Sequence, residues 1–518
     1  MRFSPVVAAA LLLIASLVPL AAQTASNQCA SNPAFPDPAS AASNWNGFGA
    51  DISNSRFQSA TGAIPAAQVP GLKLKWAFGL PGAKQVYGEP SVVGGRVFVS
   101  GDTGVVYSLD ASTGCLYWTF QADAGVRAAV SIKPAKPSSI AYVGDLKANV
   151  YALDAQKGTL LWKVQVDDHP TAHITGAPQV FEDRVYVPVA SGEEGTSSDA
   201  QYPCCSFRGS VVALDAAKGK QLWKTWIISD VPKVVSKNKN GVSRWAPAGG
   251  GIWSAPTIDP KRRALYVGTG DAYTSPAAKN TDAVMALNLD TGKILWSVQA
   301  TENDAWVVGC MRPTPLENCP KDFGPDQDFG SPPILHDLPD GHTLLIAGQK
   351  SGNVWAFDPD RQGAIAWRTA LVNNTKEFGG KIVWGAAADD RTAYFGLGEG
   401  AVAAVDIRTG ERKWLTPFTA ADGRPKRPGH EGPVTAIPGI VFTGGFDGVM
   451  RALSASDGKV VWQFDTLRDF ETVNSVPAKG GSIGAAGPVV AGGMLFVPSG
   501  YVGVSNSIPG NVLLVFAP

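Results

Sequence analysis

Two aspartates and one lysine stand where their side chains could do chemistry together. Asp326 and Asp328 share the stretch Gly324-Pro-Asp-Gln-Asp-Phe-Gly330, and Lys350 follows one expected strand later. A buried carboxylate can act as a general base, and a lysine beside it can serve as a cationic anchor. The sequence indicates all three as catalytic candidates, with Asp326 as the first choice of base. We expect Asp328 to point to the opposite side from Asp326, so that only one of the two faces the site.

A second set of acidic residues could bind a metal ion. Glu193 and Glu194 lie in the stretch Ser191-Gly-Glu-Glu-Gly195, and Asp271 ends the stretch Gly268-Thr-Gly-Asp271. Several oxygen ligands are what a hard cation such as Ca2+ requires. The spacing does not decide between Glu193 and Glu194, and each carboxylate could instead belong to a solvated turn.

Two further stretches could hold a flat group. Three glycines precede Trp253 in Gly249-Gly-Gly-Ile-Trp253 and allow close backbone approach, while the indole offers a stacking surface. Cys204 and Cys205 are adjacent in the sequence. A disulfide between them would offer a small, apolar stacking surface, and it would close no chain loop. The alternative is a pair of free or separately bonded thiols.

The elements that must position these residues come from a repeated hairpin, clearest in Asn149–Trp162 (NVYALDAQKGTLLW). Its alternating strands flank a turn that Asp154 can cap and Gly158 can close. In every copy a Trp lies four residues after the Gly. The other copies end at Trp118, Trp223, Trp296, Trp367, Trp414 and Trp462.

Two unpaired halves of the repeat lie near the chain ends. Leu72–Trp76 is a second strand without a first, and Asn511–Phe516 is a first strand without a second. Repeats of this length with four strands each are typical of propeller blades. We therefore expect an all-β, eight-bladed β-propeller of four-stranded blades, with the ring closed by N- and C-terminal strands.

Insertions indicate where function lies on this ring. The spacing between successive repeat tryptophans is longest before Trp223, Trp296 and Trp367, and all the acidic candidates fall in or near these stretches. Long loops on a repetitive scaffold are usually functional. One of them carries Cys310 and Cys319, while the pairing of the remaining Cys29 and Cys115 stays open.

The chain begins like an exported protein. Residues 1–22 contain Arg2, an apolar run and small residues, which is typical of a secretory signal peptide, and residues 23–518 are expected to form a single propeller domain. Six cysteines fit an oxidising compartment, periplasmic or extracellular. With 44 Lys plus Arg against 44 Asp plus Glu, nothing suggests a nucleic-acid partner. We expect no membrane span.

These motifs together resemble the pyrroloquinoline quinone (PQQ) alcohol dehydrogenases over nearly the whole mature chain. The resemblance rests on the repeat, the opening Trp45–Phe57, the adjacent cysteines, GGGIW, GTGD and the Asp326 stretch. The runs CCSFRG and DQDFGSPPIL are most similar to the branch that oxidises polyvinyl alcohol. Many relatives have Asn in place of Asp271, which adds a negative charge here.

The resemblance implies roles for individual residues. PQQ would stack on Trp253 and be covered by the Cys204–Cys205 disulfide, with Arg127 and Thr175 anchoring its carboxylates. Ca2+ would be bound by Asp271 and by Glu193 or Glu194. Asp326 or Asp328 would be the base, and Lys350 would contact the reactive carbonyl of the quinone.

The implied activity is oxidation of secondary alcohols, including polymers like polyvinyl alcohol, to ketones. No haem-attachment motif CxxCH is present, so an external cytochrome c is the expected electron acceptor. Two alternatives stay open. One is a non-enzymatic propeller scaffold of the kind used in outer-membrane assembly, and the other is a PQQ dehydrogenase for another alcohol or a sugar.

Overall fold

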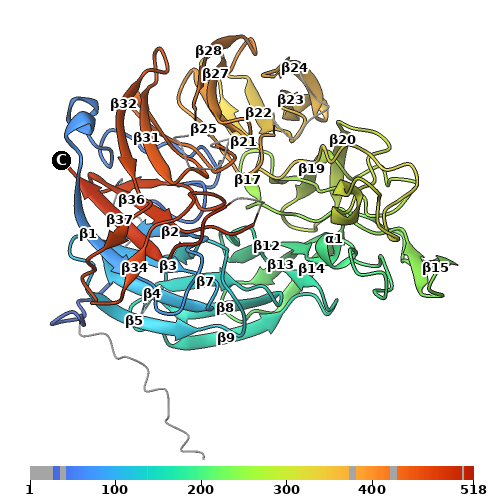
Figure 1. Ribbon diagram of the computed structural model, residues 1–518, viewed down its shortest axis with the longest axis horizontal. Coiled ribbons are helices and arrows are strands. Elements are labelled where there is room, and N and C mark those ends of the chain that lie inside the picture. The colour runs from blue at the N-terminus through green and yellow to red at the C-terminus, as the bar shows by residue number, and fades with distance from the viewer. Residues whose placement is uncertain (1–26, 36–42, 137, 373–380, 420–428, 504–506) are drawn as a thin grey trace, which may run out of the picture.

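The computed structural model describes residues 27–35, 43–136, 138–372, 381–419, 429–503 and 507–518. The expected signal peptide, residues 1–22, lies outside these ranges. Among the described residues, no helix is long and apolar enough to cross a membrane. Figure 1 shows antiparallel sheets following one another around a ring, so the predicted all-β, eight-bladed propeller is confirmed.

Seven blades follow in chain order, each built of four main strands. The first two are β2 (Gly88–Val93), β3 (Arg96–Ser100), β4 (Val105–Asp110) and β5 (Leu116–Gln121), then β6 (Ser131–Lys133), β7 (Ile140–Gly144), β8 (Asn149–Asp154) and β9 (Leu160–Gln165). The third and fourth are β11 (Gln179–Phe181), β12 (Arg184–Ser191), β13 (Ser210–Asp215) and β14 (Gln221–Trp226), then β17 (Thr257–Asp259), β18 (Ala264–Gly268), β19 (Ala283–Asn288) and β20 (Ile294–Gln299). The fifth to seventh are β21 (Ile334–Asp337), β22 (Thr343–Gly348), β23 (Asn353–Asp358) and β24 (Ala364–Ala370), then β25 (Ala386–Ala388), β26 (Thr392–Leu397), β27 (Ala401–Asp406) and β28 (Arg412–Pro417), and finally β29 (Thr435–Ile437), β30 (Ile440–Gly444), β31 (Val449–Ser454) and β32 (Val460–Asp465).

The eighth blade joins the two ends of the chain, as the sequence predicts. It combines β35 (Val489–Ala491), β36 (Met494–Ser499) and β37 (Val512–Ala517) with β1 (Lys73–Gly79). The β1 and β37 strands pair antiparallel, with Gly79 opposite Val512. Because these strands are more than four hundred residues apart in sequence, their hydrogen bonds close the ring.

The repeated Gly and Trp explain how neighbouring blades dock. Trp118 donates its indole N–H to the carbonyl of Ala155 in the next blade at 3.1 Å. Gly158 has φ +71°, and a Cβ there would lie 2.5 Å from the Trp118 ring, so only glycine fits. The same indole donation links Trp76 to Ala111, Trp162 to Ala216, Trp223 to Leu289, Trp367 to Ile407, Trp414 to Ala455 and Trp462 to Leu72.

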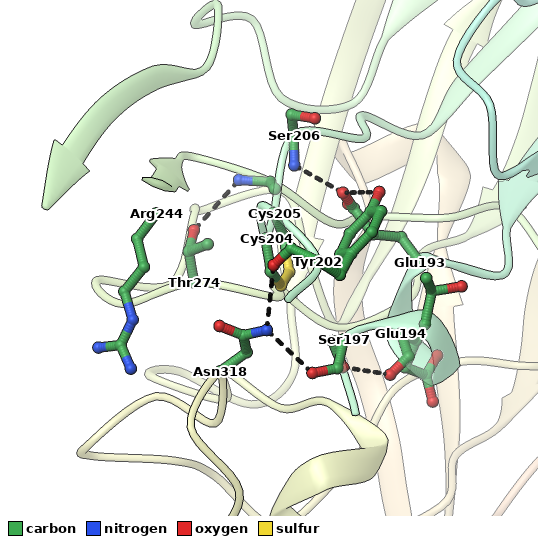
Figure 2. Close-up of a disulfide and its surroundings, with 12 residues drawn as sticks. Glu193, Glu194, Ser197, Tyr202, Cys204, Cys205, Ser206, Arg244, Thr274 and Asn318 are labelled. Atoms are coloured by element: carbon green, nitrogen blue, oxygen red, sulfur yellow. Dashed lines mark hydrogen bonds between the residues drawn. A yellow bond between two sulfur atoms is a disulfide. The ribbon is translucent and has the colours of Figure 1, made fainter. Parts of the chain in front are cut away.

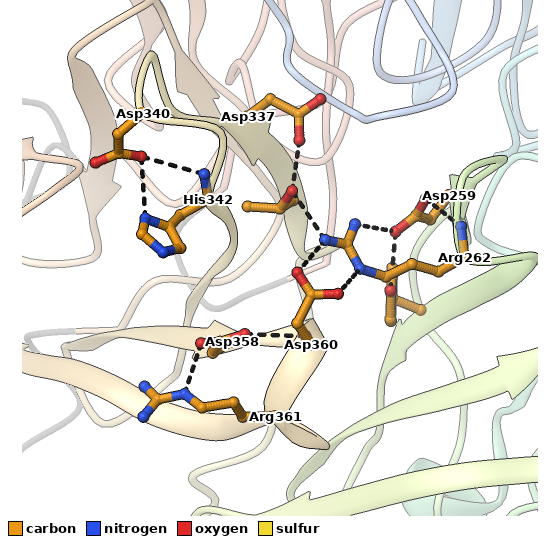
Figure 3. Close-up of polar contacts among 10 residues, drawn as sticks. Asp259, Arg262, Asp337, Asp340, His342, Asp358, Asp360 and Arg361 are labelled. Carbon is orange, nitrogen blue, oxygen red and sulfur yellow. Dashed lines mark hydrogen bonds and ion pairs between the residues drawn. The ribbon is translucent and has the colours of Figure 1, made fainter.

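Polar side chains at the hairpin ends add local and inter-blade bonds (Figure 3). Asp358 accepts hydrogen bonds from the Asp360 amide at 2.9 Å and from Arg361 Nε at 2.7 Å, the turn-capping role expected for this repeat position. Arg262 of the fourth blade pairs with its neighbour Asp259 and with Asp360 of the fifth. The Arg262–Asp259 pair is largely buried and Asp360 is exposed, and together they fix the geometry of the junction between the two blades.

The long insertions lie beside one another. They include the one-turn helix α1 (Glu193–Thr196), the hairpin β15 (Lys233–Lys237) and β16 (Ser243–Ala246), and the 3-10 turn η3 (Val308–Met311). Asn318 of the third insertion donates to the carbonyls of Ser197 and Tyr202 in the first. Arg244 of the second pairs with Glu317 of the third at 3.2 Å. The smaller elements are η2 (Ala66–Gly71), β10 (Ala172–His173), η4 (Pro359–Arg361), β33 (Asp469–Phe470) and β34 (Ala478–Lys479).

All six cysteines form disulfides: Cys29 with Cys115, Cys204 with Cys205, and Cys310 with Cys319. The expected adjacent pair is therefore present, and the open question of Cys29 and Cys115 is answered. Their bond ties the segment before the ring to the first blade. It closes a long chain loop, which is the kind that limits the unfolded state most.

Candidate active site

Asp326, Asp328 and Lys350 meet at one buried site. Lys350 follows β22, and its Nζ lies 2.7 Å from Oδ1 of Asp326 and 2.9 Å from Oδ1 of Asp328. A second ammonium group, that of Lys381, pairs with the other oxygen of Asp326. Asp326 is 4% exposed and Asp328 is fully buried. Lys350 is thus shared by the two carboxylates.

The expectation that Asp326 and Asp328 point to opposite sides is wrong. Their segment precedes β21 and is not a strand, and Asp326 has a φ of +62° in the left-handed region. Residues two apart share one face even in a regular strand, so side-chain alternation would not have separated the two aspartates. In the structure both carboxylates reach the same lysine.

The surroundings shift the pKa values of the two carboxyl groups in opposite directions. Burial would raise the pKa of Asp326, but Lys350 and Lys381 outweigh it and hold this pKa below its usual value. Burial raises the pKa of Asp328, and the attraction of Lys350 only partly opposes it. Burial would lower the pKa of Lys350, yet the surrounding carboxylates raise it well above its ordinary value. Of the two aspartates, Asp328 is the better proton acceptor.

Asp271 brings a third carboxylate to this site. It follows β18, and its oxygen lies within 4.8 Å of ligand oxygens of Asp326 and Asp328. Neither Asp271 oxygen has a hydrogen-bond partner among the described residues. Burial and the charges of the neighbouring aspartates raise the pKa of Asp271 well above its usual value. A cation placed among these oxygens would relieve both the repulsion and the missing bonds.

The three glycines before Trp253 help to place Asp271. The amide of Gly250 donates to the Asp271 carbonyl at 2.7 Å. Gly249 has φ +117°, and a Cβ there would come within 2.3 Å of that same carbonyl. The close approach expected toward a flat ligand is thus made, at Gly249, to the protein's own backbone.

Glu193 and Glu194 face different surroundings, although the sequence does not separate them. Glu193 is fully buried and accepts hydrogen bonds from the Tyr202 hydroxyl at 2.9 Å and from the amides of Ser206 and Phe207 at 2.8 Å (Figure 2). It therefore holds the loop that carries Cys204 and Cys205.

Of the two glutamates, Glu194 is therefore the candidate for the acidic site. Burial raises the pKa of Glu194 to about 7, and the charges acting on it are those of Lys350, Asp326, Asp328 and Lys381. Its carboxylate therefore senses the same cluster as Asp271. Adjacent residues in a helical turn point about 100° apart, which explains how the neighbouring glutamates divide these roles.

Trp253, Arg127 and Thr175 line a common pocket together with Phe48 and Trp384. The Arg127 guanidinium lies 4.3 Å from the centre of the Trp384 ring. Thr175 donates its hydroxyl to the Trp253 carbonyl at 2.9 Å, so in this structure it positions Trp253. Three of the expected cofactor-binding residues are therefore brought together, and they surround aromatic surfaces suited to a flat ligand.

The Cys204–Cys205 disulfide has its own packing environment. It does not line the pocket of Trp253, and its cysteines pack in a buried cluster with Phe207, Tyr273 and Trp306. The backbone of the pair is held by β16, because the Trp245 amide donates to the Cys204 carbonyl at 3.0 Å. The role of this disulfide in covering the cofactor stays a prediction.

Several residues of this region are not identified from the sequence. Lys381 and Trp384 come from a blade without a long insertion, and Asp282 and Asp304 lie in stretches without a recognisable motif. His173 packs against Trp253, with the ring centres 5.7 Å apart, and burial lowers its pKa to about 3. The sequence carries no signal for these contacts beyond the residue types themselves.

Comparison with known proteins gives a family match over the first half of the chain. The family described as "Glucose/ethanol/alcohol dehydrogenase, beta-propeller domain" of the PQQ type matches residues 45–322. A second family, described as "Outer membrane protein assembly factor BamB", matches residues 350–478. The first match covers the three insertions up to residue 322, with Glu194, Trp253 and Asp271.

Similar proteins cover most of the chain. It is 44% identical to a polyvinylalcohol dehydrogenase from Pseudomonas sp. over 497 residues, which are 91% of this chain and 76% of that protein. It is 38% identical to a polyvinylalcohol dehydrogenase from Sphingopyxis sp. (strain 113P3), over 95% of this chain and 78% of that protein. Among solved structures, the quinohemoprotein alcohol dehydrogenase ADHIIG of Pseudomonas putida has the same fold, with a TM-score of 0.70, 20% identity and coverage of 94% of this chain and 83% of that one.

Proposed function

This chain belongs to the PQQ-dependent alcohol dehydrogenases, and from that premise we propose that it oxidises secondary hydroxyl groups of polymers such as polyvinyl alcohol to ketones. The observation that carries the chemical part is the buried arrangement of Asp328, Lys350 and Asp271. It combines a proton acceptor, a charged anchor and an open metal ligand within one site.

The residue types that line this pocket suit PQQ, a flat quinone that carries carboxylates, although its free volume of about 30 Å³ requires the lining side chains to move apart. Trp253 and Trp384 provide aromatic surfaces, and Arg127 provides a cation. In the described part of the chain, no carboxylate forms an ion pair with Arg127, so its charge is available to an anionic ligand. We assign Trp253 and Arg127 to PQQ binding and Thr175 to positioning Trp253.

The acidic residues suit a hard cation beside that pocket. Asp271 offers two buried oxygens without hydrogen-bond partners among the described residues, and Glu194 senses the same charges. Glu193 is occupied by the disulfide loop and is the weaker candidate. We therefore assign Ca2+ to Asp271 and Glu194, with Asp326 able to complete the oxygen set.

The residues of this chain divide the proton chemistry among them. Asp328 accepts the proton of the substrate hydroxyl, because its raised pKa makes it the stronger base of the pair. Lys350 holds both aspartates and stays charged, so it can stabilise negative charge that develops nearby. PQQ, when bound, would supply the acceptor for the hydride of the carbon that carries this hydroxyl. Loss of one proton and one hydride converts a secondary alcohol to a ketone.

The rest of the proposal concerns location and electron transfer. We infer that residues 1–22 are a secretory signal and that residues 23–518 work as one propeller domain in the periplasm or outside the cell. Three disulfides support an oxidising compartment. Two electrons leave the protein per alcohol, and we infer an external cytochrome c as their acceptor.

A non-enzymatic scaffold would be expected to have no cluster of buried charged residues in its ring. Its support is the BamB-type match over residues 350–478, where the blades carry few insertions. A docking scaffold has no use for several carboxylates and two ammonium groups buried at one place, because burying charge is costly. The enzyme is therefore the better reading of the whole chain.

Reconstitution tests the proposal. Purified protein should oxidise 2,4-pentanediol with an artificial electron acceptor when PQQ and Ca2+ are both added. Removal of Ca2+ with a chelator should abolish turnover, and added Ca2+ should restore it. Turnover without PQQ, or PQQ binding with no oxidation of any alcohol, would refute it.

A further inference from the structure

Asp282 is a buried carboxylate for which the proposed function has no use. It precedes β19 in the fourth blade and is 0% exposed. Neither of its oxygens accepts a hydrogen bond that meets the usual geometry among the described residues; its close polar neighbours are the Asp271 carboxylate and Thr281, whose hydroxyl donates to the Ala278 carbonyl. The ion pairs of Lys350 and Lys381 in this region go to Asp326 and Asp328. A buried carboxylate without a compensating charge is strongly destabilising, so this position requires an explanation.

The oxygens of Asp282 converge with those of two other aspartates. Asp271, Asp282 and Asp304 each offer an oxygen, and these three atoms lie within 4.8 Å of one another. Asp271 and Asp304 are also buried. Ca2+ binds oxygen at 2.3–2.6 Å, so one ion can touch two oxygens as far as about 5 Å apart. Three oxygens evenly placed around one ion at this distance lie at most about 4.5 Å apart, so a single ion can contact all three once the side chains draw slightly together.

Asp304 connects this group to the catalytic segment. Its carboxylate accepts the amide of Asp326 at 3.2 Å and the amide of Gln327 at 2.7 Å. Each carboxylate oxygen keeps a further lone pair, so these bonds leave room for a metal ion. A cation at this position would fix Asp304, and through it the backbone that carries Asp326 and Asp328.

We propose that Asp271, Asp282 and Asp304 bind a second hard cation such as Ca2+, next to the ion assigned to Asp271 and Glu194. Asp271 would then be shared between two ions, one on each side of its carboxylate. The second ion would act as a positioning element for the catalytic segment. The site does not depend on PQQ, because none of its ligands lines the pocket of Trp253.

Protons are the rival explanation for the same geometry. Burial and the neighbouring carboxylates raise the pKa values of Asp271 and Asp282 well above the usual range, and that of Asp304 to about 6. Two of these groups could therefore share a proton instead of a metal ion. The two explanations differ in the number of Ca2+ ions that the protein holds.

The test counts Ca2+ with and without PQQ. Wild-type protein and Asp282→Asn are treated with a chelator, dialysed against CaCl2 at pH 8 and assayed for bound Ca2+ per chain by elemental analysis. We expect Asp282→Asn to hold one ion fewer than wild type in both conditions. Asp145→Asn is the matched control, because Asp145 is equally buried but fully bonded to Asn149, Tyr151 and nearby amides.

Equal counts in wild type and Asp282→Asn would overturn the second site and favour the shared proton. A wild-type count of no more than one ion with PQQ bound would do the same without any variant, should Asp282→Asn fail to fold. Failure of the proposed enzyme activity is a separate result. A protein that oxidises no alcohol but loses one Ca2+ with Asp282→Asn would still contain the site.

Discussion

Replacing Asp326 and Asp328 one at a time should distinguish a loss of proton transfer from a loss of the structure of the site. Asp328→Asn keeps the size of the side chain but removes the group with the raised pKa. Loss of a positioned base typically lowers turnover by about a hundredfold or more, which corresponds to about 2.7 kcal/mol in the activation barrier. PQQ binding should persist, because Trp253 and Arg127 are unchanged.

Asp326→Asn should give a different pattern. Asp326 pairs with both Lys350 and Lys381, so its replacement breaks two buried ion pairs at once. Breaking a buried pair typically costs about 3–5 kcal/mol of folding stability. The negative charge of Asp326 also contributes to the raised pKa of Asp328. Its removal should lower the pKa of Asp328 and move the acid limb of the turnover profile to lower pH.

The assay is a paired measurement on both variants. PQQ occupancy comes from the absorption spectrum, turnover from an artificial electron acceptor between pH 5 and 9, and stability from thermal unfolding of the PQQ-free protein. We expect Asp328→Asn to lose turnover and to lose less stability than Asp326→Asn, because it breaks one buried ion pair and Asp326→Asn breaks two; Asp326→Asn should also shift the pH profile. The reasoning is refuted if Asp326→Asn loses turnover at every pH while Asp328→Asn retains it.

Three further results are expected. Glu194→Gln should weaken Ca2+ binding to the PQQ-loaded protein in calorimetry, whereas Glu193→Gln should leave it nearly unchanged and lower the unfolding temperature; the reverse pattern would exchange their roles. His173 has a pKa lowered to about 3 by burial against an unfolded value near 6.5, so stability should be lost as the pH falls below about 6.5, by at most about 1.4 kcal/mol per pH unit. His173→Gln should make that loss less steep in denaturant titrations, and an unchanged slope would contradict the assignment. Initial rates should be higher with 2,4-pentanediol and polyvinyl alcohol than with methanol or glucose, and a clear preference for glucose would place the chain in another branch of the family.

The fold is predictable from the sequence because the residues that form each hairpin and each blade junction recur in every repeat. The Gly that closes a hairpin and the Trp four residues later are local features, and both are visible in the chain. In the ring, Trp118 covers Gly158 of the next blade and donates to Ala155. The same pair of residues therefore encodes the hairpin and the junction between blades, which is why the number of blades and the ring closure follow from the spacing.

The site is less predictable because it joins single residues from different blades. Lys381 reaches Asp326 from a part of the chain without any motif, and only the closed ring brings them together. Asp326 and Asp328 both reach one lysine from a segment that is not a strand, with Asp326 at a left-handed φ. Neither feature leaves a pattern in the sequence, since one depends on long-range packing and the other on the local backbone conformation.

The adjacent cysteines acquire a role that their chemistry alone does not indicate. Their bond closes no chain loop, so it adds little by restricting the unfolded state. In the structure it lies in a loop that Glu193 holds through the amides of Ser206 and Phe207. The next residue, Glu194, faces the charges of the catalytic cluster. The one turn of α1 thus connects the disulfide loop to the proposed metal site, and a shift of that loop would move Glu194 with it.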